Sequence, residues 1–189
     1  MKKNILLLTM VIAAAIQFAI PVNGIRHHER ILKEGERVLF ECRPVDPLDI
    51  FRGRYVRINP NIGEVSFIED IEKIQRGQPY YLRFSVNEES VASQFRASLK
   101  KPKSGPYLRL ISNRYMAKPI TFRPVTNFKR YYMNEKLAPA AETAYRDAQR
   151  ENNAHVAIRI LDGEGLIERI LIDKTPIEDY LRELLLSEE

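Results

Sequence analysis

The residue types that carry out nucleophilic and metal chemistry are scarce in this chain of 189 residues. It has one cysteine, Cys42, and three histidines, His27, His28 and His155. A catalytic thiolate needs a base such as histidine beside it, and His27 and His28 closely follow an apolar N-terminal segment. Because adjacent side chains point in different directions on a helix or a strand, these two histidines are poor joint ligands for a metal ion. We therefore predict no metal site and no cofactor, and we expect Cys42 to be a small apolar strand residue.

Hydrolysis is the enzymatic alternative that the sequence leaves open. A serine nucleophile would need lysine or another base, and the candidate serines lie in no G-x-S-x-G motif: Ser66, Ser85, Ser98 and Ser104. Glu41, Asp46 and Asp49 could converge as an acid/base pair, but carboxylates beside prolines in turns more often accept backbone N–H groups. The sequence therefore favours a role without catalysis, and we assign no catalytic residue.

The N-terminal segment predicts where the protein is placed. Ile5 to Val22 contains 18 residues without a charge, which as a helix would span roughly 27 Å, close to the hydrocarbon core of a bilayer. Lys2 and Lys3 precede it, which favours a cytoplasmic N-terminus and an exported, periplasmic remainder. Residues 1–25 are either a signal anchor or a signal peptide cleaved near Gly24. The length of the apolar run and the lack of an A-x-A site favour the anchor.

The rest of the chain predicts one extracytoplasmic domain over residues 26–189, in an α+β, β-rich fold that is mainly antiparallel. Residues 25–34 extend the first helix until Gly35 stops it. Alternation of apolar and polar residues predicts strands in segments 36–43, 55–60, 65–68, 79–87, 105–112 and 118–134. Segment 90–99 is ambiguous between helix and strand.

The C-terminal third predicts a helix, a β-hairpin and a short final helix. Small and apolar residues at helical spacing indicate a helix near 135–150, with Asn134 as its N-cap. Strands 155–161 and 166–173 flank Asp162-Gly163, a tight-turn sequence. Thr175 as cap, proline at the next position and Glu178 three residues after the cap predict the last helix.

Charge is distributed unevenly along the chain. Residues 26–89 hold 11 Lys or Arg and 12 Asp or Glu, residues 90–134 hold ten basic residues and no acid, and residues 135–189 hold 7 basic and 13 acidic residues. A block of one sign indicates an anion-binding surface, with these candidates: Arg96, Lys100, Lys101, Lys103, Arg109, Arg114, Lys129 and Arg130. In the alternative interpretation, the basic strands pack beside the acidic C-terminal part and the interleaved aromatic residues are core.

Residues 45–59, VDPLDIFRGRYVRIN, resemble the signature of the GDYXXLXY family of bacterial membrane-anchored proteins, whose usual form is close to VDPRDLFRGDYV-x-L-x-Y. The chain departs from it where Arg54 replaces aspartate, Ile58 replaces leucine and Pro60 replaces the last tyrosine. ILKEGERVLF, RYYMNE and LIDKTPIEDYL also resemble the family in order along the chain. The signature residues are candidates for an interaction site, or for a purely structural turn: Asp46, Pro47, Asp49, Arg52, Gly53 and Tyr55.

The resemblance implies membrane anchoring and a genomic association with multi-pass membrane proteins, and it carries over no catalytic or cofactor residue. We therefore expect a membrane-anchored interaction or structural module, accessory to a multi-pass membrane protein. An envelope module that binds anionic components through the basic segment is the alternative. Aromatic residues interleaved with basic ones also occur in proteins that bind single-stranded nucleic acid, but an exported domain seldom meets nucleic acid and we expect none as a partner.

Overall fold

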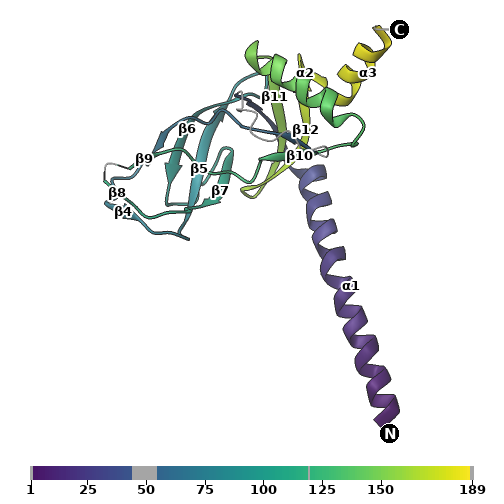
Figure 1. Ribbon diagram of the computed structural model, residues 1–189. Coiled ribbons are helices and arrows are strands. Elements are labelled where there is room, and N and C mark those ends of the chain that lie inside the picture. The colour runs from purple at the N-terminus through teal and green to yellow at the C-terminus, as the bar shows by residue number, and fades with distance from the viewer. Residues whose placement is uncertain (1, 44–54, 119, 188–189) are drawn as a thin grey trace.

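The computed structural model describes residues 2–43, 55–118 and 120–187. These residues form a compact body from which one long helix projects, with the N-terminus at its far end (Figure 1). The body combines two antiparallel sheets, several two-stranded pairs and two shorter helices. The predicted α+β, β-rich class is thereby confirmed.

The projecting helix is α1, Lys2–Glu34, and it continues through Pro21 without interruption. Its 33 residues correspond to a length of about 50 Å. The stretch Thr9–Glu34 is long and apolar enough to cross a membrane, and none of its most apolar window is buried against the body. The helix ends where the sequence predicted. The Gly35 N–H donates to the carbonyl oxygen of Ile31 at 2.9 Å, and glycine fits here because a side chain at this position would collide with that oxygen.

The first sheet has the strand order β1-β11-β12-β13. Its strands are β1 Glu36–Glu41, β11 Ala154–Leu161, β12 Glu164–Ile172 and β13 Thr175–Pro176. Asp162 and Gly163 join β11 to β12 with positive φ angles of 51° and 85°, as a two-residue hairpin turn requires. Val38 pairs with Ile158 across the sheet, and both are fully buried on the face that meets the rest of the body.

The second sheet has the order β6-β5-β7. Its strands are β5 Pro79–Val86, β6 Ala92–Ser98 and β7 Tyr107–Ile111, so the ambiguous segment 90–99 is largely strand. Beside β6 lies β3, Val65–Ser66, because the next residue, Phe67, bridges Ala97 in parallel. The remaining pairs are β3 with β9, Thr121–Phe122, β4 with β8, Lys73–Ile74 and Met116–Ala117, and β2 with β10, Tyr55–Arg57 and Arg130–Tyr132.

Two helices complete the body at the end opposite β4 and β8 (Figure 1). They are α2, Ala138–Arg150, and α3, Ile177–Ser187. They bury an alanine-rich stripe around Tyr145 on α2, and Ile177 and Leu181 on α3. The first sheet, the second sheet and these helices share one hydrophobic core, in which the Phe40 ring lies 5.4 Å from that of Phe84.

The structure corrects the predicted starts of both helices. Asn134 does not cap α2, because its side chain accepts from the N–H of Lys136 at 3.0 Å in a turn that precedes the helix. The residue at the N-cap position of α2 is Leu137, and a proline occupies its first turn. Thr175 does not cap α3 either, since it pairs with Ile172 as part of β13.

Candidate anion-binding site

Most of the signature residues singled out in the sequence lie outside the described residues: Asp46, Pro47, Asp49, Arg52 and Gly53. Tyr55 is described and opens β2, where the Arg130 guanidinium lies 5.0 Å from the centre of its ring. Val56 and Ile58 are buried, with 0% and 3% exposure. Ile58, at the leucine position of the motif, is thus a core residue, and the described end of the signature is a strand with one buried face.

The basic residues of segment 96–130 do not form one surface. Lys118 pairs with Asp70, Arg130 lies over the Tyr55 ring, and Lys129 precedes β10 on the side of the body near β2. Arg114 lies in the connection between β7 and β8, whereas Lys100, Lys101 and Lys103 lie between β6 and β7. The aromatic residues Phe122 and Phe128 are core. The buried aromatic residues therefore follow the alternative interpretation, whereas the acid that pairs with Lys118 lies outside the C-terminal part.

The second sheet brings together two of the predicted residues, Arg96 on β6 and Arg109 on β7. Between them on β5 stands Arg83, which pairs directly with Arg96 on one side and with Tyr107 on the other. All three arginines are exposed on the face of the sheet that points away from the core. Among the described residues, none of the three forms an ion pair within 4 Å.

Two tyrosines continue this face beside the arginines. Tyr81 pairs with Arg109 across the strands, and its ring lies 5.8 Å from that of Tyr107 in an edge-on arrangement. The ammonium of Lys101 lies 6.0 Å from the centre of the Tyr107 ring. The face thus combines cations with aromatic rings. Arg96, Arg109 and Lys101 belong to the predicted set, whereas Arg83 and Tyr81 lie outside segment 90–134.

A hollow of about 770 Å³ opens on this face where β3, β6 and β5 meet. Its lining combines polar and apolar residues: Glu64, Ser66, Arg83, Ser85, Gln94 and Arg96, with Val65, Ile68, Phe84 and Phe95. A β-bulge shapes it, because the pairing of β5 with β6 shifts register between Arg83 and Ser85. Gln94 takes a φ of 54° there, a region that non-glycine residues seldom adopt.

Arg83 is the residue of this site that sequence reasoning missed. It lies outside the acid-free segment 90–134, so it was not among the predicted anion-binding residues. The sequence feature that could have identified Arg83 is its position in the alternating strand 79–87, where it lies on the outward face with Tyr81 and Ser85. Its partner strand could not be read from the same pattern.

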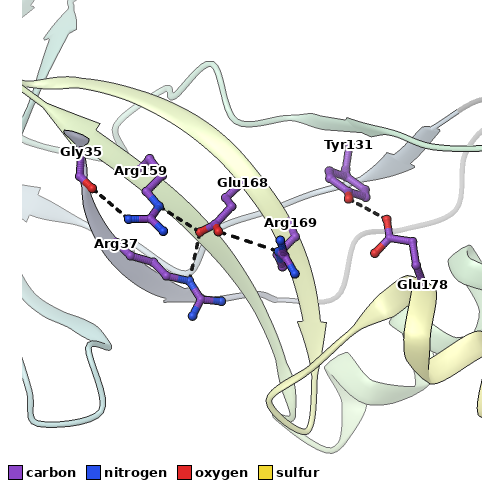
Figure 2. A network of polar contacts seen from close by, with 7 residues as sticks. All are labelled: Gly35, Arg37, Tyr131, Arg159, Glu168, Arg169 and Glu178. Carbon is purple, nitrogen blue, oxygen red and sulfur yellow. Dashed lines mark hydrogen bonds and ion pairs between the residues drawn. The ribbon is translucent and has the colours of Figure 1, made fainter. Parts of the chain in front are cut away.

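A second polar cluster joins α1 to the first sheet (Figure 2). Glu168 is the extra residue of a β-bulge in β12, and its side chain is 18% exposed. Its carboxylate lies 3.0 Å from Nε of Arg37 and 3.2 Å from Nε of Arg159, while Nη1 of Arg159 donates to the Gly35 carbonyl at 3.1 Å. Arg169 is more distant, at 3.9 Å. This cluster is internally paired and holds the end of α1 in place.

The reactive residue types are held in inert surroundings. Burial raises the pKa of the Cys42 thiol to about 12, so it stays protonated at neutral pH and is a poor nucleophile. His27 contacts Glu164 at 2.6 Å on the exposed surface between α1 and the hairpin. Within the described ranges, no group of three or more His, Cys, Asp or Glu side chains is arranged to hold a metal ion.

Comparison with known proteins identifies the family. The family model described as GDYXXLXY protein matches residues 17–170, from the apolar part of α1 to β12. A search of curated proteins and a search of solved structures found no match. Because the family match covers well over half of the 189 residues, the chain belongs to the GDYXXLXY protein family.

Proposed function

We propose that the protein is a membrane-anchored, extracytoplasmic interaction module that acts by contact, as an accessory to a multi-pass membrane protein. The observation that carries the proposal is the unbroken course of α1, which passes from an apolar segment directly into the body. Cys42 offers no nucleophile that would favour a catalytic role, since its thiol is buried and protonated.

The composition of α1 divides it into an anchor and a stalk. Ile5 to Val22 fits the bilayer, and the twelve residues Asn23–Glu34 would carry the body about 18 Å beyond it. The stalk is suited to water rather than lipid, because it is charged and carries the ion pairs Arg30–Glu34 and Glu29–Lys33, at 2.9 and 3.7 Å. A charged helix of this length supports a body that stands clear of the lipid surface.

The stalk and the body are joined without a flexible linker. Ile31 is 3% exposed and is the buried residue of α1 at the body. Gly35 then passes so close to Ile160 that a side chain on it would approach the Ile160 backbone nitrogen to 3.0 Å. Such a joint would present the faces of the body at a fixed height and angle, which suits a protein that meets partners within the same membrane.

Labelling of single cysteines tests the placement. Asn4 and Ser104 are exposed, whereas the natural Cys42 is 5% exposed and should give little background. We expect a membrane-impermeant maleimide to label Ser104→Cys in intact bacterial cells and to label Asn4→Cys only after detergent lysis. Labelling of Asn4→Cys alone in intact cells, or a mature chain beginning at Ile25, would contradict the anchored topology.

Cross-linking in intact membranes tests the interaction. We expect the full chain to form an adduct with an integral membrane protein when the cross-linker is added before solubilisation. The adduct should be absent when the membranes are dissolved in detergent first, which separates specific neighbours from chance contacts. Recovery of the free monomer alone in both cases would argue strongly against an accessory role.

A further inference from the structure

We propose that the hollow between β3, β6 and β5 binds an acidic glycan, meaning a polymer of sugars that carry carboxylate groups. The inference names the ligand of the interaction module. It depends on the proposed function only for the compartment in which such a polymer would be met.

Unpaired positive charge lines the hollow. Arg83 and Arg96 stand directly opposite each other on neighbouring antiparallel strands, where side chains begin about 5 Å apart and like charges destabilise the pair. Both line the hollow, and neither has an acidic partner within 4 Å among the described residues. An anionic group between the two guanidiniums would remove this repulsion, and guanidinium groups bind carboxylates through paired hydrogen bonds.

Neutral polar groups form another part of the lining. The Ser66 and Ser85 hydroxyls and the Gln94 amide border the same hollow. Ser85 Oγ donates to Gln94 Oε1 at 3.2 Å, which orients the Gln94 amide. The Gln94 N–H groups have no hydrogen-bond partner in the described part of the chain and are free to donate to a ligand. Hydroxyl and amide groups match the hydroxyls of a sugar, and Ile68, which is 49% exposed, offers apolar surface against which a sugar ring can pack.

The cationic and aromatic face continues beyond the hollow. Tyr81 and Tyr107 follow it, and Arg109 stands on β7, two strands away from Arg96. Neighbouring strands are about 4.8 Å apart, so Arg109 offers a second cationic point about 10 Å from the strand of Arg96. A polymer with repeated charges can use both points, whereas a single small anion cannot.

Other anionic partners fit the site less well. Glu64 borders the hollow, where its carboxylate would repel a densely charged chain such as nucleic acid but would accept hydrogen bonds from sugar hydroxyls. The proposed stalk holds its joint with the body about 18 Å from the hydrocarbon core. The headgroup layer is only about 5–8 Å thick on each side, so lipid headgroups would not reach the site. An acidic polypeptide would use the arginines but not the sugar-like match of Ser66, Ser85 and Gln94.

Binding of polygalacturonate to the full chain tests the proposal. The protein would be held in nanodiscs of zwitterionic phosphatidylcholine at constant ionic strength, with dextran, poly-L-glutamate and an oligothymidylate as comparison polymers. We expect binding of polygalacturonate, none of dextran, and weaker binding of the other two. The double variant Arg83→Gln, Arg96→Gln should bind polygalacturonate about tenfold more weakly, as loss of charge-assisted hydrogen bonds predicts.

Matched variants separate a built site from general attraction between charges. Lys129→Gln with Lys136→Gln removes the same charge from exposed positions outside the hollow and should leave binding nearly unchanged. Ser66→Tyr would fill the hollow without changing charge and should also weaken binding. The arginine double variant should melt at the same temperature or higher, because the repulsion is removed, so its weaker binding would not reflect unfolding.

Four results would overturn the proposal: no binding of polygalacturonate by the natural chain, equal losses in the two double variants, full binding by Ser66→Tyr, or tighter binding of poly-L-glutamate or the oligothymidylate. None of them bears on cysteine labelling, which reports the topology of the chain. Failure of the glycan site and failure of the anchored topology are therefore distinguishable.

Discussion

Arg159 donates a hydrogen bond from Nη1 to the carbonyl oxygen of Gly35 at 3.1 Å, and so connects the middle of the first sheet to the residue that follows α1. The last carbonyl groups of a helix lack partners within the helix, and a cation at this end also interacts favourably with the helix dipole. Glu168 holds the same arginine from the other side at 3.2 Å. The long helix is therefore fastened by side-chain contacts as well as by the chain itself.

Gly35→Ala should destabilise the joint between α1 and the first sheet. The added methyl group would meet the backbone at Ile31 and Ile160, and backbone atoms cannot move aside as a flexible side chain can. We expect a loss of about 2 kcal/mol or more in the free energy of unfolding, measured by urea denaturation of the full chain in a non-ionic detergent. Gly24→Ala is the matched control, because nothing lies within 4 Å of its added methyl group and alanine favours a helix by about 1 kcal/mol. Equal stabilities of the two variants would show that the joint at Gly35 is loose.

Glu168→Gln should loosen the cluster shown in Figure 2. The substitution keeps the shape of the side chain but leaves the guanidiniums of Arg37 and Arg159 without their carboxylate. Because both arginines are partly exposed, we expect a cost of only about 1–2 kcal/mol. Glu142→Gln on the exposed side of α2 should change stability little. The difference between the two variants should shrink at high salt, and an effect independent of salt would assign the cost to packing instead.

Stability should fall at alkaline pH. Burial raises the pKa of Cys42 from 9.0 to about 12 and the pKa of Tyr80 from 10.0 to about 12, so the folded protein keeps both groups neutral. Their contribution is complete below pH 9 and is lost between about pH 9 and 12, as the unfolded chain releases the protons first. Each fully titrating group adds a slope of about 1.4 kcal/mol per pH unit.

Two variants assign this slope. Cys42→Ala should remove the component that begins near pH 9, whereas Tyr115→Phe at an exposed position should leave the slope as it is. The measurement is urea denaturation of the full chain at a series of pH values. Rapid reaction of Cys42 with a maleimide in the folded protein at pH 8 would contradict its protonated, buried state.

Ile58→Leu should be tolerated, because leucine is the usual residue of the family at this position and conserves the buried volume. We expect a cost below about 1.5 kcal/mol for leucine and about 2–5 kcal/mol for Ile58→Ala, which leaves a cavity at a site that is 3% exposed. Thermal unfolding of the full chain measures both. Similar costs for leucine and alanine would show that the site depends on shape rather than on volume.

Local patterns in the sequence predicted the elements whose causes are local. The alternation around Val38 and Phe40, the Asp162-Gly163 turn and the glycine stop of α1 all depend on neighbouring residues, and the structure confirms each of them. The predicted caps at Asn134 and Thr175 were wrong because other contacts competed for these residues. Asn134 is used by an earlier turn, and Thr175 is used by pairing with Ile172 on β12.

The site was less predictable because it depends on strand pairing. Composition predicted that segment 90–134 would be basic, but it could not show that Arg83 lies opposite Arg96 or that Lys118 is paired with Asp70. The sequence at the bulge contains no glycine or other turn residue that would predict the positive φ angle of Gln94. The hollow itself forms only when β3 packs along the outer side of β6. These contacts join residues from four separate segments.

In the proposed anchored topology, the continuous run of α1 into Gly35 would also affect how often the protein meets its neighbours. A body on a flexible linker would reorient over a wide range of angles and would expose all of its faces to a partner. A body on a rigid helix anchored in a bilayer would diffuse and rotate only in the plane of the membrane. Its encounters with other membrane proteins would therefore occur at one height and in few orientations. Complex formation would then cost less translational and rotational entropy. Even a small contact area on this molecule could suffice for a lasting association.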